Sequence, residues 1–139
     1  MSTPNSTSEY LLLFRGTDWD RALAPDDLQE AMTRFRGWFE RLSADGILKA
    51  SQPLTDDGRI ISGKSGRTVT DGPFTESKEA IGGYSIITAA NFDAAVVIAR
   101  QCPMLDFGVD VEVRPIATEC QVLHRARQRA TEETALAVA

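Results

Sequence analysis

The stretch that decides how this chain folds runs Asp71-Gly72-Pro73-Phe74-Thr75-Glu76-Ser77-Lys78-Glu79-Ala80-Ile81-Gly82-Gly83-Tyr84. The residue before a proline is biased towards extended backbone and glycine favours turns, so no helix can run through residues 71–74. Residues 75–79 leave room for about one helical turn, with Thr75 as its cap and Glu76 at the favourable end of the helix dipole. The stretch therefore leaves one strand and enters another.

The chain is short enough to form one domain and large enough to bury a real core, since it has 139 residues. Hydrophobic residues make up 42% and charged residues 25%, both close to the average for globular proteins. The net charge of −5 opposes binding to a phosphate backbone, which argues against nucleic acid as a partner. The sequence shows no membrane-spanning run and no signal peptide, so we expect a cytoplasmic protein that does not bind membranes.

The first half of the chain reads as a strand, a helix and a second strand. The apolar run 10–14 predicts a central strand, and 47–50 predicts a second strand that Pro53 breaks. Between them, Pro25 suits the first helical position and Gly46 ends the helix. The predicted buried face of this helix consists of residues that recur every four, three, four and three positions: Leu28, Met32, Phe35, Phe39 and Leu42. Trp38 borders this face.

A β-hairpin is predicted next, because residues 59–62 and 67–70 flank the glycine-bearing loop Gly63-Lys64-Ser65-Gly66. A phosphate-binding loop is the alternative interpretation, since glycines, a lysine and a serine are its ingredients. The loop lacks the Walker spacing and is followed by strand residues, which favours the hairpin.

The second half repeats the pattern of strand, helix and strand. Residues 84–89 are rich in β-branched side chains, and Asn91 caps a helix that stops at Pro103. The buried face of that helix is predicted to contain Phe92, Ala95, Val96 and Ala99. In the last strand Val109, Val111 and Val113 alternate with Asp110, Glu112 and Arg114, which gives one apolar and one polar face.

Both ends of the chain lie outside this pattern. Residues 1–8 are polar and expected to fray, residues 9–117 form the domain, and residues 118–139 form a weakly amphipathic tail. The tail is expected to pack on a dimer partner or to stay mobile. Cys102 is predicted to be a buried small hydrophobe and Cys120 an incidental thiol, and neither cofactor nor metal is predicted.

The order of these elements predicts an α+β domain with a split β-α-β arrangement and an inserted hairpin. The DGPF stretch also resembles the signature of the DGPF domain family, which is related to YCII-like proteins. The resemblance extends from Tyr10 to about Pro115 and includes Phe14-Arg15-Gly16, Gln101-Cys102-Pro103 and residues 111–115. It implies a ferredoxin-like domain that dimerises into a dimeric α/β barrel. YCII-like proteins are thought to use a His-Asp pair, but the matching region here contains no histidine, because His124 lies in the tail.

The usual strand order of this fold suggests a site. We expect the first strand to lie between the third and the last, parallel to the third and antiparallel to the last. This places the end of the last strand near the start of the third strand and puts Arg15 at the opposite end. The predicted neighbourhood contains Asp71, Lys78, Glu79, Gly82, Gly83, Tyr84 and Arg114.

Two chemical interpretations of this neighbourhood stay open. In the first, Asp71 or Glu79 accepts a proton, Arg114 or Lys78 holds an anionic group, and the glycines let a ligand approach the backbone. In the second, Asp71 caps its turn and a glutamate, Glu79 or Glu112, pairs with Arg114 for purely structural reasons.

Two functions follow from these interpretations. One is a small-molecule-binding protein or an enzyme with isomerase- or lyase-like acid/base chemistry. The alternative is a non-catalytic dimeric regulatory or partner-binding module, which the resemblance links to sigma-factor control of transcription. Both versions predict a homodimer.

Overall fold

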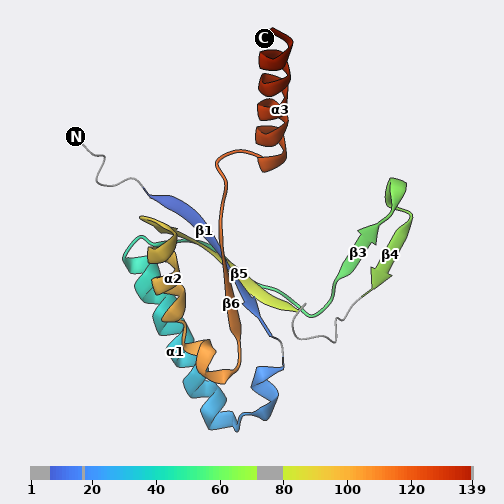
Figure 1. The fold of residues 1–139 in the computed structure, drawn as a ribbon. Coiled ribbons are helices and arrows are strands. Elements are labelled where there is room, and N and C mark those ends of the chain that lie inside the picture. Colours follow the sequence, from blue (N-terminus) through green and yellow to red (C-terminus); the bar gives the residue numbers. More distant parts are fainter. Residues whose placement is uncertain (1–6, 17, 72–79, 139) are drawn as a thin grey trace, which may run out of the picture.

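The computed structural model describes residues 7–16, 18–71 and 80–138. The core elements are β1 (Ser8–Arg15), α1 (Pro25–Ala44), β2 (Leu48–Pro53), β5 (Ile81–Ala89), α2 (Phe92–Arg100) and β6 (Asp110–Pro115). A hairpin of β3 (Arg59–Ser62) and β4 (Thr68–Asp71) and a terminal helix α3 (Gln121–Val138) project from this body (Figure 1). Short 3-10 turns are η1 (Trp19–Ala22), η2 (Lys64–Gly66) and η3 (Pro103–Phe107).

The four-stranded sheet has the order β2-β5-β1-β6, and every neighbouring pair in it is antiparallel. Two units, β1-α1-β2 and β5-α2-β6, are therefore interleaved, which confirms the predicted α+β class and the split β-α-β arrangement. Within the described residues the sheet stays open and does not close into a barrel.

The predicted direction of the third strand was wrong. β1 and β2 are joined by a helical crossover and run parallel to each other, and β5 lies between them, antiparallel to both. The start of β5 therefore lies beside the end of β1. The register pairs Arg15 with Ile81 on β5 and with Asp110 on β6, whereas Arg114 pairs with Leu11 near the other end of β1.

Both core helices pack against one face of the sheet. Tyr10, Leu12 and Phe14 alternate along β1 and are buried, and they share a cluster with residues of both helices. That cluster includes Trp38 and Leu42 of α1, Ala95 and Ala99 of α2, and also the predicted buried thiol of Cys102. The alternate side chains of β1 face away from the helices.

The buried face of α1 is rotated from the predicted stripe. Trp38 is only 1% exposed, whereas Met32 is 40% exposed. The reason is aromatic packing, because Trp38 and Phe35 both set their rings nearly perpendicular to Phe14, at 87°. On α2, Phe92 is also largely exposed and stays in ring contact with Tyr10.

The predicted hairpin is confirmed, and its strands β3 and β4 form a two-stranded sheet apart from the main sheet. Ile61 lies opposite Val69, and Arg59 donates to the Asp71 carboxylate over 3.0 Å. Every residue of β3 and β4 is exposed. In contrast to the expected break, β2 continues through Pro53, because β2 is an edge strand where a missing N–H is tolerated.

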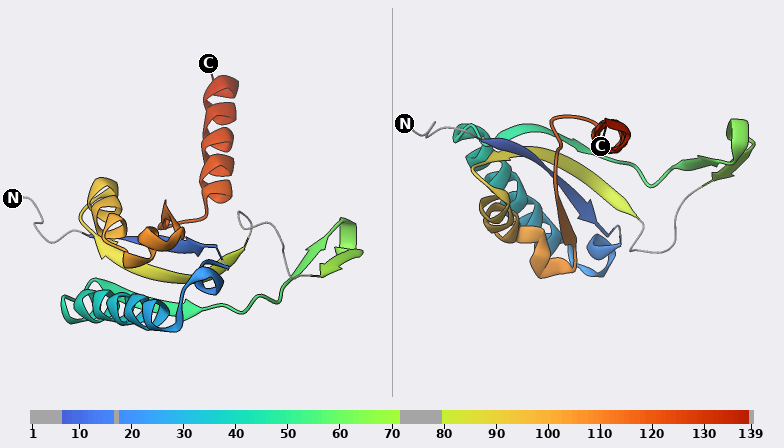
Figure 2. Two further views of the ribbon diagram at one scale, coloured as in Figure 1. Left: turned by 90° about the horizontal axis from the view of Figure 1, so that it is seen from below. Right: turned by 45° about the horizontal axis from the view of Figure 1, so that its top comes forward.

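The terminal helix α3 stands apart from the rest of the body (Figure 1 and the left view of Figure 2). Its residues from 121 to 137 are all exposed. None of the helices in the described part of the chain has the length and apolar character that a membrane span requires.

A substitution at Gly83 tests how closely the backbones of β2 and β5 approach each other. A Cβ atom at Gly83 would lie 3.0 Å from the carbonyl oxygen of Gln52, whereas one at Gly82 would have nothing nearer than 3.6 Å. We predict that Gly83→Ala lowers the free energy of unfolding by about 1–3 kcal/mol, as overpacking does. Gly82→Ala is the matched control and should change stability by less than about 0.5 kcal/mol. Urea unfolding followed by tryptophan fluorescence measures both, and equal values would show that this strand spacing adjusts freely.

Candidate functional site

A cavity of about 370 Å³ lies where β1 ends and β5 begins, between the sheet and α1. Its apolar lining comes from five elements or their ends: Phe14, Trp19, Met32, Phe35, Phe39, Met104 and Val109. Ser51 of β2 adds a hydroxyl, and Gln52 of β2 and Tyr84 of β5 border the cavity at the sheet. None of the described lining residues carries a formal charge at neutral pH.

Aromatic rings form the wall of the cavity on the α1 side. Phe35 and Phe39 lie 4.5 Å apart at 70°, and Phe14 packs edge-on against both. Such perpendicular ring pairs are favourable, so these contacts stabilise the wall.

The polar groups at the β2 side are already hydrogen-bonded. The hydroxyls of Ser51 and Ser85 lie 2.9 Å apart, and the Ser51 hydroxyl donates to the Tyr84 carbonyl oxygen over 3.2 Å. Gln52 lies opposite Tyr84 in the register and is exposed. A ligand would meet the Ser51 hydroxyl here, in a lining that is otherwise mainly apolar.

The structure places some of the predicted site residues at this cavity. Gly82, Gly83 and Tyr84 line it. The close approach at Gly83 comes from the backbone of β2, which is a structural reason for a glycine there. Lys78 and Glu79 lie outside the described residues, so their roles stay predictions.

Asp71 and Arg114 form ion pairs away from the cavity. The Asp71 carboxylate pairs with Arg59 at the base of the projecting hairpin, where both side chains are about three-quarters exposed. Arg114 lies 3.9 Å from a carboxylate oxygen of Glu112. The pairing of a glutamate with Arg114 thus follows the structural interpretation, and a proton-accepting role for Asp71 stays a prediction.

The wrong direction predicted for the third strand also separated Arg15 from the start of that strand, whereas the structure places Arg15 beside Ile81 at the start of β5. Its guanidinium lies 2.5 Å from the other oxygen of Glu112, so Glu112 is shared by two arginines. Arg15 and the Ile81 end of β5 are in register, which puts this charged group at the same end of the sheet as the cavity. Arg15 belongs to the Phe14-Arg15-Gly16 segment, and only the correct strand direction would have revealed its position.

Burial raises the pKa of the Cys102 thiol to about 11, although hydrogen bonds with the backbone at Met104 and Leu105 lower it. Within the described ranges, no three His, Cys, Asp or Glu side chains are placed to hold a metal ion.

Residues 10–117 match the family of proteins with a YCII-related domain, which covers all four strands of the sheet and both core helices. The chain therefore belongs to the YCII-related family. A search of the curated proteins finds no match. The terminal helix α3 lies beyond the matched residues.

The two cysteines should differ sharply in reactivity. Cys102 is 3% exposed with a pKa near 11, so its thiolate is scarce at pH 8 and its sulfur is covered. We predict that Cys120→Ser abolishes rapid reaction with a disulfide reagent, whereas Cys102→Ser leaves it intact. Fast labelling of the Cys120→Ser chain under native conditions would contradict this burial.

The pKa of the Cys102 thiol in the folded protein lies above its ordinary value of 9.0, so this thiol ionises at lower pH in the unfolded chain. The free energy of unfolding should therefore fall as pH rises from about 9 to 11.

Proposed function

We propose that this YCII-related protein binds a small, largely apolar molecule in the cavity between α1 and the start of β5. The observation that carries the proposal is the cavity itself, about 370 Å³ in volume and walled mainly by aromatic and thioether side chains. Ligand pockets in proteins have this size and this mixture of apolar walls with a few polar groups. The absence of charge among the described lining residues favours a neutral ligand portion at this wall.

The chemical class follows from the lining. Rings on Phe35 and Phe39 offer edge and face contacts to a flat ligand. Ser51 supplies a hydroxyl at the β2 side, on the same face of the sheet as Ser85. A cyclic molecule with a phenol, lactone or similar polar group fits these features.

An enzymatic version of this proposal needs a proton acceptor. We take Glu79 as the candidate because the next residue in the sequence, Ala80, accepts a hydrogen bond at its carbonyl oxygen from the N–H of Gly16 over 3.1 Å, and Gly16 lines the cavity. Asp71 would first have to release Arg59. Isomerase- or lyase-like chemistry is therefore proposed only as an extension of binding.

Filling the cavity tests the binding proposal. Met32 lines the cavity, whereas Val97 is 55% exposed on α2 and is not one of the lining residues. Met32→Trp should abolish the thermal stabilisation that a phenolic or lactone ligand gives to the unmodified chain, and Val97→Trp should retain it. A Trp19 fluorescence change on binding would be a second signal, since Trp19 also lines the cavity. Equal ligand shifts in both variants would place binding elsewhere.

We further propose that the open face of the sheet forms a homodimer, which would complete the dimeric α/β barrel expected from the family resemblance. Leu11 pairs with Ile86 and Leu13 pairs with Tyr84 across β1 and β5, on the face away from both helices. These four side chains are only partly buried. Packing two such faces together would remove a continuous apolar surface from water. A non-catalytic dimeric module would use the same face.

The dimer proposal is tested by one charge in this face. Light scattering of the unmodified chain at micromolar concentration should give twice the 15.2 kDa mass of one chain. Leu13→Glu should raise the dimer dissociation constant by at least about tenfold, because it buries an unpaired charge. Val97→Glu, on the exposed side of α2, is the control. An unchanged dissociation constant for Leu13→Glu would rule out this face.

A further inference from the structure

The terminal helix α3 exposes apolar side chains that no described part of the chain covers. It is 18 residues long and its apolar side chains are exposed, with Val122 at 63% and Leu136 at 77%. Most of the stability of a helix in a protein comes from packing an amphipathic face against other parts of the structure. A covering surface would therefore stabilise α3.

One face of α3 is shallowly grooved, and we call it the tail face: Val122, Arg125, Ala126, Arg129, Ala130 and Glu133. Small alanines occupy its middle, so a partner with large side chains can come close. Its charges are ordered along the helix, with arginines towards the N-terminus and Glu133 towards the C-terminus. That order gives the tail face a direction as well as a shape.

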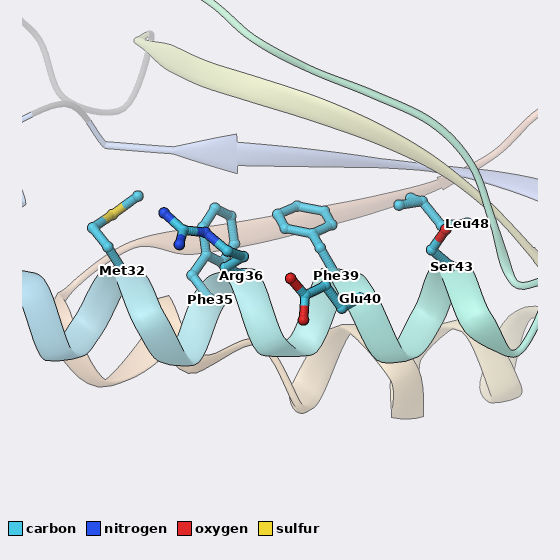
Figure 3. A pocket seen from close by; sticks show the side chains of 7 residues that line it. All are labelled: Met32, Phe35, Arg36, Phe39, Glu40, Ser43 and Leu48. Atoms are coloured by element: carbon cyan, nitrogen blue, oxygen red, sulfur yellow. The ribbon is translucent and has the colours of Figure 1, made fainter.

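A groove on α1 has the complementary features (Figure 3). We call it the α1 groove: Met32, Phe35, Arg36, Phe39, Glu40, Ser43 and Leu48. Its floor is formed by large apolar side chains, of which Met32 is 40% exposed, and its volume is about 370 Å³. Arg36 and Glu40 are exposed and lie one helical turn apart beside the apolar floor.

The two surfaces match when the helices run antiparallel. Setting Arg36 opposite Glu133 then also sets Glu40 opposite Arg129, so both charge pairs form at once. The same alignment brings Ala130 over Phe39, a small side chain over a large one. It also places Ala126 opposite Ser43 and Val122 beside Leu48, at the end of the groove.

A parallel arrangement fails on charge. If Arg36 lies opposite Glu133 in parallel helices, Glu40 lies opposite Ala137 and gains nothing. If Glu40 lies opposite Arg129, then Arg36 faces Arg125, which is a like-charge contact. The charge pattern therefore selects the antiparallel direction.

The reach of the chain favours docking between two copies. α3 follows β6, which is one edge of the sheet, and the α1 groove borders β2, which is the other edge. Ile116 is held to β1 by a 3.0 Å hydrogen bond to the Glu9 carbonyl, so only residues 117–120 are left to cross. Five Cα–Cα steps join Ile116 to Gln121 and span at most about 18 Å. Three strand spacings already need about 14 Å before the chain passes around the sheet edge to the helix layer.

We propose that α3 of one copy of this chain docks antiparallel in the α1 groove of a second copy, with Glu133 on Arg36 and Arg129 on Glu40. The contact is separate from the open sheet face, and it does not depend on ligand binding. Because Met32, Phe35 and Phe39 line both the α1 groove and the cavity, docked α3 also covers one side of the cavity.

Reversing the charges on each side tests the proposal by hydrogen exchange in residues 121–137. In the full-length chain, protection of α3 should rise with protein concentration, as expected for association. The groove variant Arg36→Glu with Glu40→Arg should lose protection by about tenfold, and so should the tail variant Arg129→Glu with Glu133→Arg. Mixing the two variants should restore protection in both, since each tail then meets a matching groove.

The mixture separates the outcomes. Peptides from the two variants differ in mass, so each tail is followed independently. Rescue only when all four substitutions are in one chain, and not in the mixture, would show docking within a single copy and overturn the proposal. Full protection of α3 in either variant alone, or no protection in the unmodified chain at any concentration, would also overturn it.

A matched control moves a charge outside the tail face. Gln128→Glu with Glu132→Gln leaves the net charge unchanged, and neither residue is among those that form the tail face. This variant should keep the protection of the unmodified chain. An equal loss in the control would mean that general helix electrostatics, rather than the paired charges, protects α3. Leu13→Glu tests the sheet-face dimer separately, so failure of one contact can be told from failure of the other.

Discussion

The antiparallel position of β1 between β5 and β6 is the constraint on which the rest of the structure depends. Both edges of β1 are hydrogen-bonded, so its register commits every side chain to one face of the sheet. Leu12 and its neighbours at alternate positions are buried beneath the helices, and Leu11 and Leu13 are left on the open face. A shift by one residue would exchange these two sets and destroy the core.

The cavity is a consequence of how aromatic rings pack on β1. Phe14 is at the end of the strand and meets Phe35, Trp38 and Phe39 with its ring nearly perpendicular to theirs. The side chains that complete a core elsewhere are replaced at this end by Gly16, Gly82 and Gly83. Large rings on one side and glycines on the other leave a space that neither can fill.

Three surfaces of the molecule expose apolar side chains to water, which lowers the stability of the elements that carry them. The open sheet face, the projecting hairpin and α3 all present aliphatic side chains to water, with Ile61 at 69% exposure and Leu136 at 77%. A two-stranded hairpin and a lone helix are marginal in isolation. Contacts between copies would solve this problem for the sheet face and for α3, and the charges of α3 and α1 give the second contact a defined direction.

The sequence by itself determined the elements, because periodicity and turn chemistry are local. The strand around Leu12, the helix from Pro25, the hairpin around residues 63–66 and the cap at Asn91 could all be predicted from neighbouring residues. The buried face of α1 was less accurately predicted, since the contacts of Trp38 with Phe14 join residues far apart in the chain. Strand direction is decided by how the α1 crossover and β5 fit together. Only the tertiary structure therefore placed Arg15 beside the start of β5, moved Arg114 to the other end and paired Asp71 with Arg59.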